Sequence, residues 1–427
     1  MHHVVRENEI LTYPTLYEVR NLSSVDRQFG LVPRIWSSNH HITRVAFPKD
    51  SIPYPYNAAR GPLHRNSSRG ILILNLTIPF LHQAHSRLTN HDQIGFKHGS
   101  EAKAKIQGTL SFYREYFMRK ANLDWDAACL NAEKFMPLLT RDWSSLVEEM
   151  EGVAEGSGLS FSTILAINVR TEISMGMMTD GCTALAWKTD SEALLAQNWD
   201  WEVPQQANLI ALHIHRQAPQ TSISQITEAG IIGKIGLNSS GVGVCLNAIR
   251  ARGISYSRLP AHLALRAGLD SASRSEAVER LEKAGLGAAA HILIADETGG
   301  TSMEFSALDL VKFEMRDGKV AHTNHFLVQH AEGVADATFL PDSKERMQRI
   351  TELMAKEKTA GVPSVQKMLQ DEMNLPGAIN RVASEKSPSA TLFSIVMDLK
   401  ARKAMVKVGR PTECEDTLVL NPRSVGE

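Results

Sequence analysis

One cysteine stands out by its neighbours. Cys182 follows Gly181 directly and opens the alternating stretch "CTALAWKT" in the interior of the chain. Glycine has no side chain, so the carbonyl before the cysteine is open to attack and the backbone can adopt strained angles. The thiol could attack that carbonyl, convert the peptide bond to a thioester and let water cut the chain. The alternative is a small buried apolar residue, the commonest state of a cysteine outside a disulfide.

Cleavage of that bond would make Cys182 the first residue of a new chain. Its α-amino group would titrate near about 8, so at neutral pH part of it is unprotonated and can take the proton of the thiol. Nucleophile and base would then belong to one residue, and no separate pair of cysteine and histidine is needed. This mechanism explains why the thiol can occupy the middle of the encoded chain.

The elements that must position Cys182 change type at this residue. Before it, apolar residues recur at three- and four-residue steps, which predicts helices in "HDQIGFKHGSEAKAKIQGTLSFYREYFMRKAN", "WDAACLNAEKFMPLL", "RDWSSLVEEMEGVAEGSG" and "SFSTILAINVRTEI". After it, alternation predicts strands in "CTALAWKT", "ALLAQNW", "NLIALHIHR", "ISQITEAG", "GVGVCLNA", "AHILIADE", "TSMEFS", "LVKFEMRDGKVAHTNH", "ATLFSIVMDL" and "KAMVKV". Helices return in "LPAHLALRAGL", "SRSEAVERLEKAG" and "SKERMQRITELMAKE". Strands joined by hairpins such as "DSE", with helices in blocks, favour antiparallel sheets flanked by helices over a doubly wound parallel sheet.

Two other patterns do not support a binding motif. The glycine-rich stretch "GIIGKIGLNSSGVG" is not a phosphate loop, because Glu228 stands where the loop needs glycine and Ile235 where it needs serine or threonine. These glycines are therefore assigned to tight turns and close strand packing. His322 and His325 in "HTNH" have no carboxylate or cysteine cluster nearby in sequence, so a structural role is favoured over a metal site.

Composition restricts the class of partner. The 46 basic residues almost balance the 47 acidic ones, which argues against a nucleic-acid or anionic-membrane binder and favours a small ligand. No apolar run approaches the roughly 20 residues that cross a bilayer, and the start lacks a secretory pattern. The four cysteines lie far apart without a CxxC spacing, which is typical of reduced thiols in an intracellular protein: Cys129, Cys182, Cys245 and Cys414.

The first 90 residues differ from the rest of the chain. They hold seven of the 16 histidines, carry ten basic against five acidic residues, and show no sustained period. We therefore expect 1–90 to be a poorly ordered or atypical extension, with a weak organelle presequence or an imperfect gene model as alternatives. Residues 91–427 are expected to form the functional domain.

From about residue 92 to the end, long blocks follow one another in a fixed order. They are "IGFKHGSEAKA", "NVRTE", "DGCT", "QNWD", "ITEAGIIGKIGLNSSGVGV", "LPAHLALR", "HTNH", "SATLF" and "GRPT". Together they resemble the fungal acyl-coenzyme A:6-aminopenicillanic acid acyltransferase (isopenicillin N acyltransferase) family, in the peptidase C45 group of N-terminal-nucleophile hydrolases. The resemblance implies an α+β fold, a four-layer αββα sandwich with two mainly antiparallel sheets between helical layers. It also implies cleavage between Gly181 and Cys182 into an α chain (to 181) and a β chain (182–427).

The resemblance also assigns roles to individual residues. Cys182 would be the nucleophile in self-cleavage and in turnover, and Asp200 of "QNWD" would hold the new amino group by a charge-assisted hydrogen bond. Asn324 of "HTNH" would supply an oxyanion-hole N–H, and Arg410 of "GRPT" would lie close to the nucleophile and favour its thiolate. Without the resemblance, a strand end, a turn cap and a surface ion pair would be the simpler roles of the last three residues.

The implied activity is transfer of an acyl group from acyl-CoA or an amide to an amine such as 6-aminopenicillanic acid, through a thioester acyl-enzyme. Acyl-CoA would be a substrate, and no cofactor or metal is expected. The alternatives are an amidohydrolase that uses water as acceptor and a binding protein that never cleaves itself. Because the end "NPRSVGE" lacks a peroxisomal tripeptide, we expect a cytoplasmic protein.

Overall fold

Helices precede Cys182 in the chain and strands dominate after it, as the sequence predicts. The computed structural model describes residues 71–77, 90–174, 181–335 and 341–424. The first helices are α1 (Asn90–Glu101), α2 (Lys103–Ala121), α3 (Trp125–Glu133), α4 (Met136–Asp142), α5 (Ser144–Ser157), α6 (Phe161–Asn168) and α7 (Arg170–Ile173). Three predicted helices are each divided in two, the first of them at Ala102 between α1 and α2. Pro137 in the first turn of α4 begins a new helix, and Val169 leaves helical geometry between α6 and α7.

One sheet has eight strands in the order β1-β4-β5-β6-β7-β8-β9-β10. Its strands are β1 (Leu72–Thr77), β4 (Leu209–His215), β5 (Ile223–Glu228), β6 (Ile235–Asn238), β7 (Gly243–Ala248), β8 (Ala290–Asp296), β9 (Gly299–Phe305) and β10 (Leu310–Glu314). A 3-10 helix, η2 (Val203–Asn208), leads into β4. Only the pairing of β1 with β4 is parallel, so the described sheet is mainly antiparallel.

The second sheet has six strands, all antiparallel, in the order β11-β2-β3-β12-β13-β14. Its strands are β2 (Thr183–Lys188), β3 (Ala193–Glu202), β11 (Lys319–His322), β12 (Ser389–Asp398), β13 (Lys403–Val408) and β14 (Leu418–Leu420). The predicted hairpin of β2 and β3 is confirmed, with Thr183 paired to Asn198. Cys182 therefore lies immediately before a central strand of this sheet.

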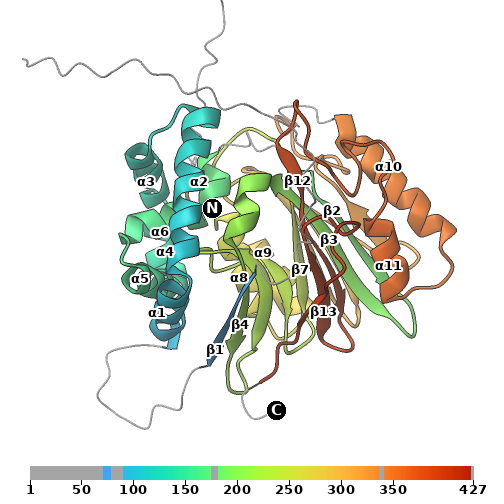
Figure 1. Cartoon of the computed structure of the whole chain (residues 1–427), viewed down its shortest axis with the longest axis horizontal. Helices are drawn as coiled ribbons and strands as arrows, with labels where there is room; N and C mark the ends of the chain where they lie inside the picture. The colour runs from blue at the N-terminus through green and yellow to red at the C-terminus, as the bar shows by residue number, and fades with distance from the viewer. Residues whose placement is uncertain (1–70, 78–89, 175–180, 336–340, 425–427) are drawn as a thin grey trace, which may run out of the picture. The chain divides into compact units, whose positions relative to one another are not determined.

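The two sheets face each other, and helices cover their outer faces (Figure 1). Against the eight-stranded sheet pack α8 (Ala261–Leu269) and α9 (Arg274–Ala284), while α10 (Pro341–Lys356) and α11 (Val362–Leu369) cover the six-stranded sheet. The largest apolar core lies between the sheets, and a smaller one lies under α10 and α11. This arrangement confirms the predicted αββα sandwich, with two mainly antiparallel sheets between helical layers. Among the described helices, none combines the length and apolar character needed to span a membrane.

Several elements differ from the sequence prediction. Leu72–Thr77, inside the extension that we expected to be poorly ordered, form the edge strand β1, so that expectation is wrong for this segment; residues 1–70 and 78–89 lie outside the described residues. Side chains alternate along β1, so that Leu74 and Leu76 are buried. This alternation covers only six residues, and the composition of the first 90 residues does not reveal it. β6, β14 and α11 are not among the predicted elements. β6 lies in the glycine-rich stretch assigned to tight turns and close strand packing, and Gly236 does pack closely on β5, since an added Cβ would lie 2.3 Å from the carbonyl oxygen of Ser224.

Glycines bring α1 and α5 into close contact. Gly95 and Gly99 of α1 face the backbone of α5, and Gly152 and Gly156 of α5 face the backbone of α1. A Cβ added at any of the four would come within 3.0 Å of backbone atoms of the other helix, a distance that real Cβ atoms essentially never show. The two helices can approach this closely only because these positions lack side chains.

Gly152→Ala is therefore expected to lower the free energy of unfolding by about 1–3 kcal/mol, the usual cost of overpacking. Helix propensity alone predicts the opposite, since alanine favours a helix by about 1 kcal/mol over glycine. Urea denaturation measures the difference. Gly361→Ala is the matched control, because a Cβ there meets nothing closer than 3.7 Å. A Gly152→Ala chain at least as stable as the parent would contradict the packing argument.

Candidate active site

The side chains of Cys182 and Asp200, two of the predicted site residues, lie on opposite faces of the six-stranded sheet. Thr183 and Asn198 face the α10–α11 layer: Thr183 Oγ1 accepts a hydrogen bond from Arg346 at 3.2 Å, and Asn198 Nδ2 donates to two carbonyls at and after the end of α11. Side chains alternate along a strand. Asp200, two residues after Asn198, therefore also faces the α10–α11 layer, while the side chain of Cys182 belongs to the core between the sheets.

Cys182 is buried, with 1% of its surface exposed, and none of the four cysteines forms a disulfide. Its carbonyl oxygen accepts a hydrogen bond from Nη1 of Arg346 at 2.7 Å. Among the described residues, a thiolate at Cys182 raises the pKa values of Cys245 in β7 and of Lys234 just before β6. Burial and the Cys182 thiolate both raise the pKa of Cys245 well above its usual value, so Cys245 remains a neutral thiol.

Gly181 has a reason to be glycine that the sequence did not indicate. The guanidinium of Arg381 occupies the space that a side chain would need: an added Cβ would lie 2.6 Å from its Cζ. Any other residue at this position would displace Arg381. The guanidinium therefore lies directly against the backbone that precedes Cys182.

Asp200 is fully buried near the end of β3. Its carboxylate accepts hydrogen bonds from Thr391 Oγ1 at 2.7 Å and from Nε of Arg381 at 3.3 Å. Burial raises the pKa of Asp200 to about 7, although Arg381 and Arg346 act to lower it. A second carboxylate, Asp342, accepts from Arg381 at 2.5 Å and from Arg346 at 3.2 Å. Two guanidinium groups and two carboxyl groups thus meet at one end of β2 and β3.

Asn324 follows β11 and is linked to this group through Arg346. Its Oδ1 accepts from Nη2 of Arg346 at 3.0 Å, and its Nδ2 donates to the carbonyl of Ala248 at 2.9 Å. The backbone N–H of Asn324 donates to Ser343 Oγ at 2.8 Å. Arg346 therefore bridges Asn324 and the carbonyl of Cys182, and the amide N–H that was expected in an oxyanion hole is donated to a carbonyl at the end of β7.

Arg410 lies outside this group. Its guanidinium donates to Glu372 at 2.5 Å, to Glu413, and to the carbonyl of Arg381 at 3.1 Å. The guanidinium groups that reach Cys182 and Asp200 belong instead to Arg346 and Arg381. The structure thus brings Cys182, Asp200 and Asn324 together, and it connects Arg410 to them only through the backbone of Arg381.

Sequence reasoning missed both of these arginines. Arg346 lies in an amphipathic helix whose charges look solvated, and Arg381 lies in the loop that precedes the block "SATLF". Both side chains are almost fully buried, which is rare for arginine without paired carboxylates. The one available signal was the position of Arg381 shortly before a shared block.

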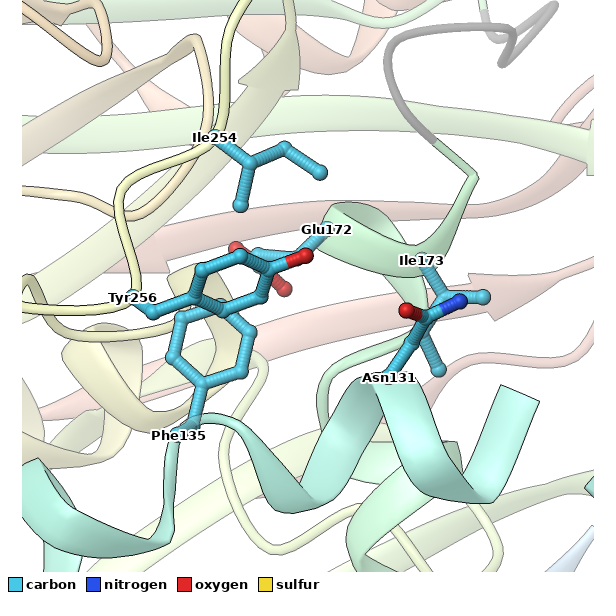
Figure 2. A pocket seen from close by; sticks show the side chains of 6 residues that line it. All are labelled: Asn131, Phe135, Glu172, Ile173, Ile254 and Tyr256. Carbon is cyan, nitrogen blue, oxygen red and sulfur yellow. The ribbon is translucent and has the colours of Figure 1, made fainter. Parts of the chain in front are cut away.

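A small crevice lies at the end of α7, the last described helix before Cys182. Its lining consists of Asn131, Phe135, Glu172, Ile173, Ile254 and Tyr256 (Figure 2). Tyr256 packs against Phe135 at a ring-centroid distance of 5.0 Å. One oxygen of Glu172 accepts from the N–H of Ala261 at 2.8 Å, and the other has no partner among the described residues. Burial raises the pKa of Glu172 to about 7.

Two comparisons with known proteins identify the class of this chain. A family model described as acyl-coenzyme A:6-aminopenicillanic acid acyl-transferase matches residues 187–413. The acyl-coenzyme A:6-aminopenicillanic-acid-acyltransferase 40 kDa form of Emericella nidulans is 37% identical over 342 residues, which cover 77% of this chain and 93% of the relative. The chain therefore belongs to the acyl-coenzyme A:6-aminopenicillanic acid acyltransferase family, and it is an enzyme of the acyltransferase type.

Solved structures show more distant similarity. A mutant of conjugated bile acid hydrolase from Clostridium perfringens aligns with a TM-score of 0.43 and 15% identity, over 56% of this chain and 92% of that chain. Penicillin V acylase from Agrobacterium tumefaciens aligns with a TM-score of 0.35 and 13% identity, over 53% and 83% of the two chains.

The buried carboxyl of Glu172 predicts a pH-dependent stability. In the folded chain the Glu172 carboxyl keeps its proton up to about pH 7, whereas in the unfolded chain it loses the proton near pH 4.5. Between these values the folded chain binds more protons, so the free energy of unfolding falls as the pH rises, by about 3 kcal/mol in total. Glu172→Gln removes this contribution. In urea denaturation the parent chain, which keeps Glu172, should lose stability relative to the Glu172→Gln chain between pH 5 and 8.

Both chains in this comparison carry Cys182→Ala, so that cleavage cannot confuse the measurement. Asp200, whose pKa is also raised, is present in both and cancels. A stability difference that stays constant from pH 5 to 8 would show that the Glu172 carboxyl does not titrate as the structure indicates.

Proposed function

We propose that this chain is a self-cleaving cysteine N-terminal-nucleophile acyltransferase. It would move an acyl group from acyl-CoA or an amide to an amine such as 6-aminopenicillanic acid, through a thioester on Cys182. The observation that carries the proposal is the environment of the Gly181–Cys182 bond: the carbonyl of Cys182 is held by Arg346, and the backbone of Gly181 lies against Arg381. Family membership supports the acyl-transfer chemistry.

Self-cleavage would begin when the sulfur of Cys182 attacks the carbonyl carbon of Gly181. The carbonyl oxygen becomes an oxyanion, and the guanidinium of Arg381 beside Gly181 is placed to stabilise that charge. The C–N bond then breaks, and the proton lost by the thiol ends on the departing nitrogen of Cys182. Water hydrolyses the resulting thioester, which releases the carboxylate of Gly181 and restores the thiol.

The new amino group of Cys182 would emerge near Asp200. Arg381 connects the two, since it lies against Gly181 and donates to Asp200 at 3.3 Å. Because the pKa of Asp200 is about 7, its ionised form is accessible at neutral pH and can accept a charge-assisted hydrogen bond from the ammonium. The unprotonated amine would serve as the base for the thiol of the same residue.

Turnover would reuse these groups. The side-chain N–H of Asn324, which donates to Ala248 in the structure, would turn to the oxyanion of each tetrahedral intermediate. Arg410 would act indirectly. Its hydrogen bond to the carbonyl of Arg381 fixes the backbone of Arg381, whose side chain contacts Asp200. We assign Arg410 a positioning role in place of direct contact with the thiol.

An amidohydrolase is the alternative function. The same thioester on Cys182 can be discharged by water or by an amine, and both reactions need the same nucleophile and oxyanion donors. The choice of acceptor is set by the shape of the acceptor pocket and by water exclusion.

The two chains would remain together after cleavage. Arg170 before the cleavage site pairs with Glu228 after it at 3.0 Å, and Glu149 before the site accepts two hydrogen bonds from Arg266 after it. All four side chains are buried. Buried pairs of this kind are costly to break, because each partner would be left as an uncompensated charge.

Purified wild-type protein is therefore expected to run as two bands on a denaturing gel. The β chain, 246 of 427 residues of a 47.1 kDa protein, would run at about 27 kDa. Cys182→Ala removes the attacking sulfur and should leave one full-length band.

Cys245→Ala is the matched control, since it removes another buried cysteine of the same core and should cleave like wild type. A single full-length wild-type band, or cleavage that persists in Cys182→Ala, would overturn the self-cleavage proposal.

A further inference from the structure

Lys234 is a buried ammonium group that the mechanism above does not use. It lies just before β6 with no exposed surface, and its Nζ is 2.5 Å from Oε2 of Glu228. The same Nζ lies 3.6 Å from the centroid of the Trp199 ring. Lysine is rarely buried completely unless its charge has partners, so this position calls for a reason.

Trp199 locates Lys234 relative to the thiol. Thr183 pairs with Asn198, and extending this register by one residue places Cys182 beside Trp199 on the neighbouring strand. Both side chains belong to the core between the sheets, on the face opposite to Asp200. Lys234, which covers Trp199 on this face, is thus the ammonium on the thiol side of the bond.

The electrostatics agree with this placement. Burial lowers the pKa of Lys234 to about 8, whereas Glu228 and a thiolate at Cys182 raise it. The attraction is mutual, so a charged Lys234 stabilises the thiolate of Cys182. An ammonium has three N–H donors, and among the described residues Nζ of Lys234 donates only to Glu228.

The titratable groups near Lys234 or the Cys182 thiol come from five elements. Glu228 of β5 also accepts from Arg170 of α7 and from the hydroxyl of Tyr113 of α2. His262 of α8 and Cys245 of β7 complete the set. Burial lowers the pKa of His262 and raises those of Tyr113 and Cys245, so these three are neutral near pH 7. Lys234, Arg170 and Glu228 are the charged members.

The uncleaved chain has a need that Lys234 can meet. Before cleavage, the nitrogen of Cys182 is part of a peptide bond and cannot serve as a base. Arg346 and Arg381 contact the backbone from the other face of the sheet. An ammonium on the thiol's own side of the sheet would favour the thiolate that attacks Gly181.

We propose that Lys234 is a positioning residue for self-cleavage: its ammonium stabilises the Cys182 thiolate in the uncleaved chain. Lys234 keeps its proton throughout. The sulfur forms a bond to the Gly181 carbon, the C–N bond breaks, and the proton released by the thiol ends on the nitrogen of Cys182. This inference rests on the proposed function and adds the source of thiolate for its first step.

The test is the pH dependence of Cys182 alkylation by iodoacetamide in the full chain, in wild type, Lys234→Met and Lys234→Arg. Peptide mass spectrometry separates cleaved from uncleaved chains, because the peptide with Cys182 begins either at this residue or before it. The compared quantity is the midpoint, the pH at which the alkylation rate reaches half of its maximum. The absolute rates are not compared, because access to the buried sulfur limits them in all three chains. Lys234→Met should raise the midpoint by about one pH unit, which lowers the alkylation rate at pH 7 about tenfold.

Lys234→Arg retains the charge and should keep the midpoint close to wild type, with self-cleavage faster than in Lys234→Met. Urea denaturation shows whether each variant folds. If Lys234→Met does not fold, the test rests on folded Lys234→Arg, and an alkylation midpoint higher than that of wild type in this variant overturns the proposal. An unchanged midpoint in folded Lys234→Met overturns it as well. If the wild-type chain does not cleave but Lys234→Met still has a raised alkylation midpoint, self-cleavage is rejected and the stabilisation of the Cys182 thiolate by Lys234 is retained.

Discussion

The site depends on two guanidinium groups that fix the backbone around one peptide bond. Arg346 donates to the carbonyl of Cys182, and Arg381 fills the space beside Gly181 where a side chain would be. Both are buried, and the carboxylates of Asp200 and Asp342 compensate their charge. A buried arginine is tolerated only with such partners. The requirement for glycine, the position of the carbonyl and the burial of Asp200 therefore follow from the same cluster.

The alternation of side chains along β2 and β3 then divides the chemistry between two faces of one sheet. The thiol of Cys182 points into the core between the sheets, where Lys234 and Cys245 lie, while Asp200 points towards α10 and α11. The backbone of Gly181 and Cys182 lies between these two faces. In the proposed self-cleavage, the thiol would attack the bond from one face, and Asp200 would hold the new amino group from the other.

The sequence predicted the parts of this arrangement that depend on local pattern. The β2–β3 hairpin, the helices before Cys182 and the mainly antiparallel sheets follow from periodicity, and the glycine–cysteine pair indicated the bond that we propose is cleaved. Arg346 and Arg381 could not be found this way, because they are 164 and 181 residues distant from their partners Cys182 and Asp200. Arg410, which the family pattern indicated, binds two glutamates and the backbone of Arg381. Only tertiary packing decides which arginine reaches the bond.

The most direct test of the account is to find where the acyl group goes. The purified protein is mixed with phenylacetyl-CoA alone and quenched, and the intact masses of its chains and the masses of its peptides are measured. The account predicts one phenylacetyl group on the chain that begins at Cys182, bound to the sulfur of that residue and discharged as an amide when 6-aminopenicillanic acid is added. An acyl group on another residue, or amide formed at the wild-type rate by Cys182→Ala, would contradict it.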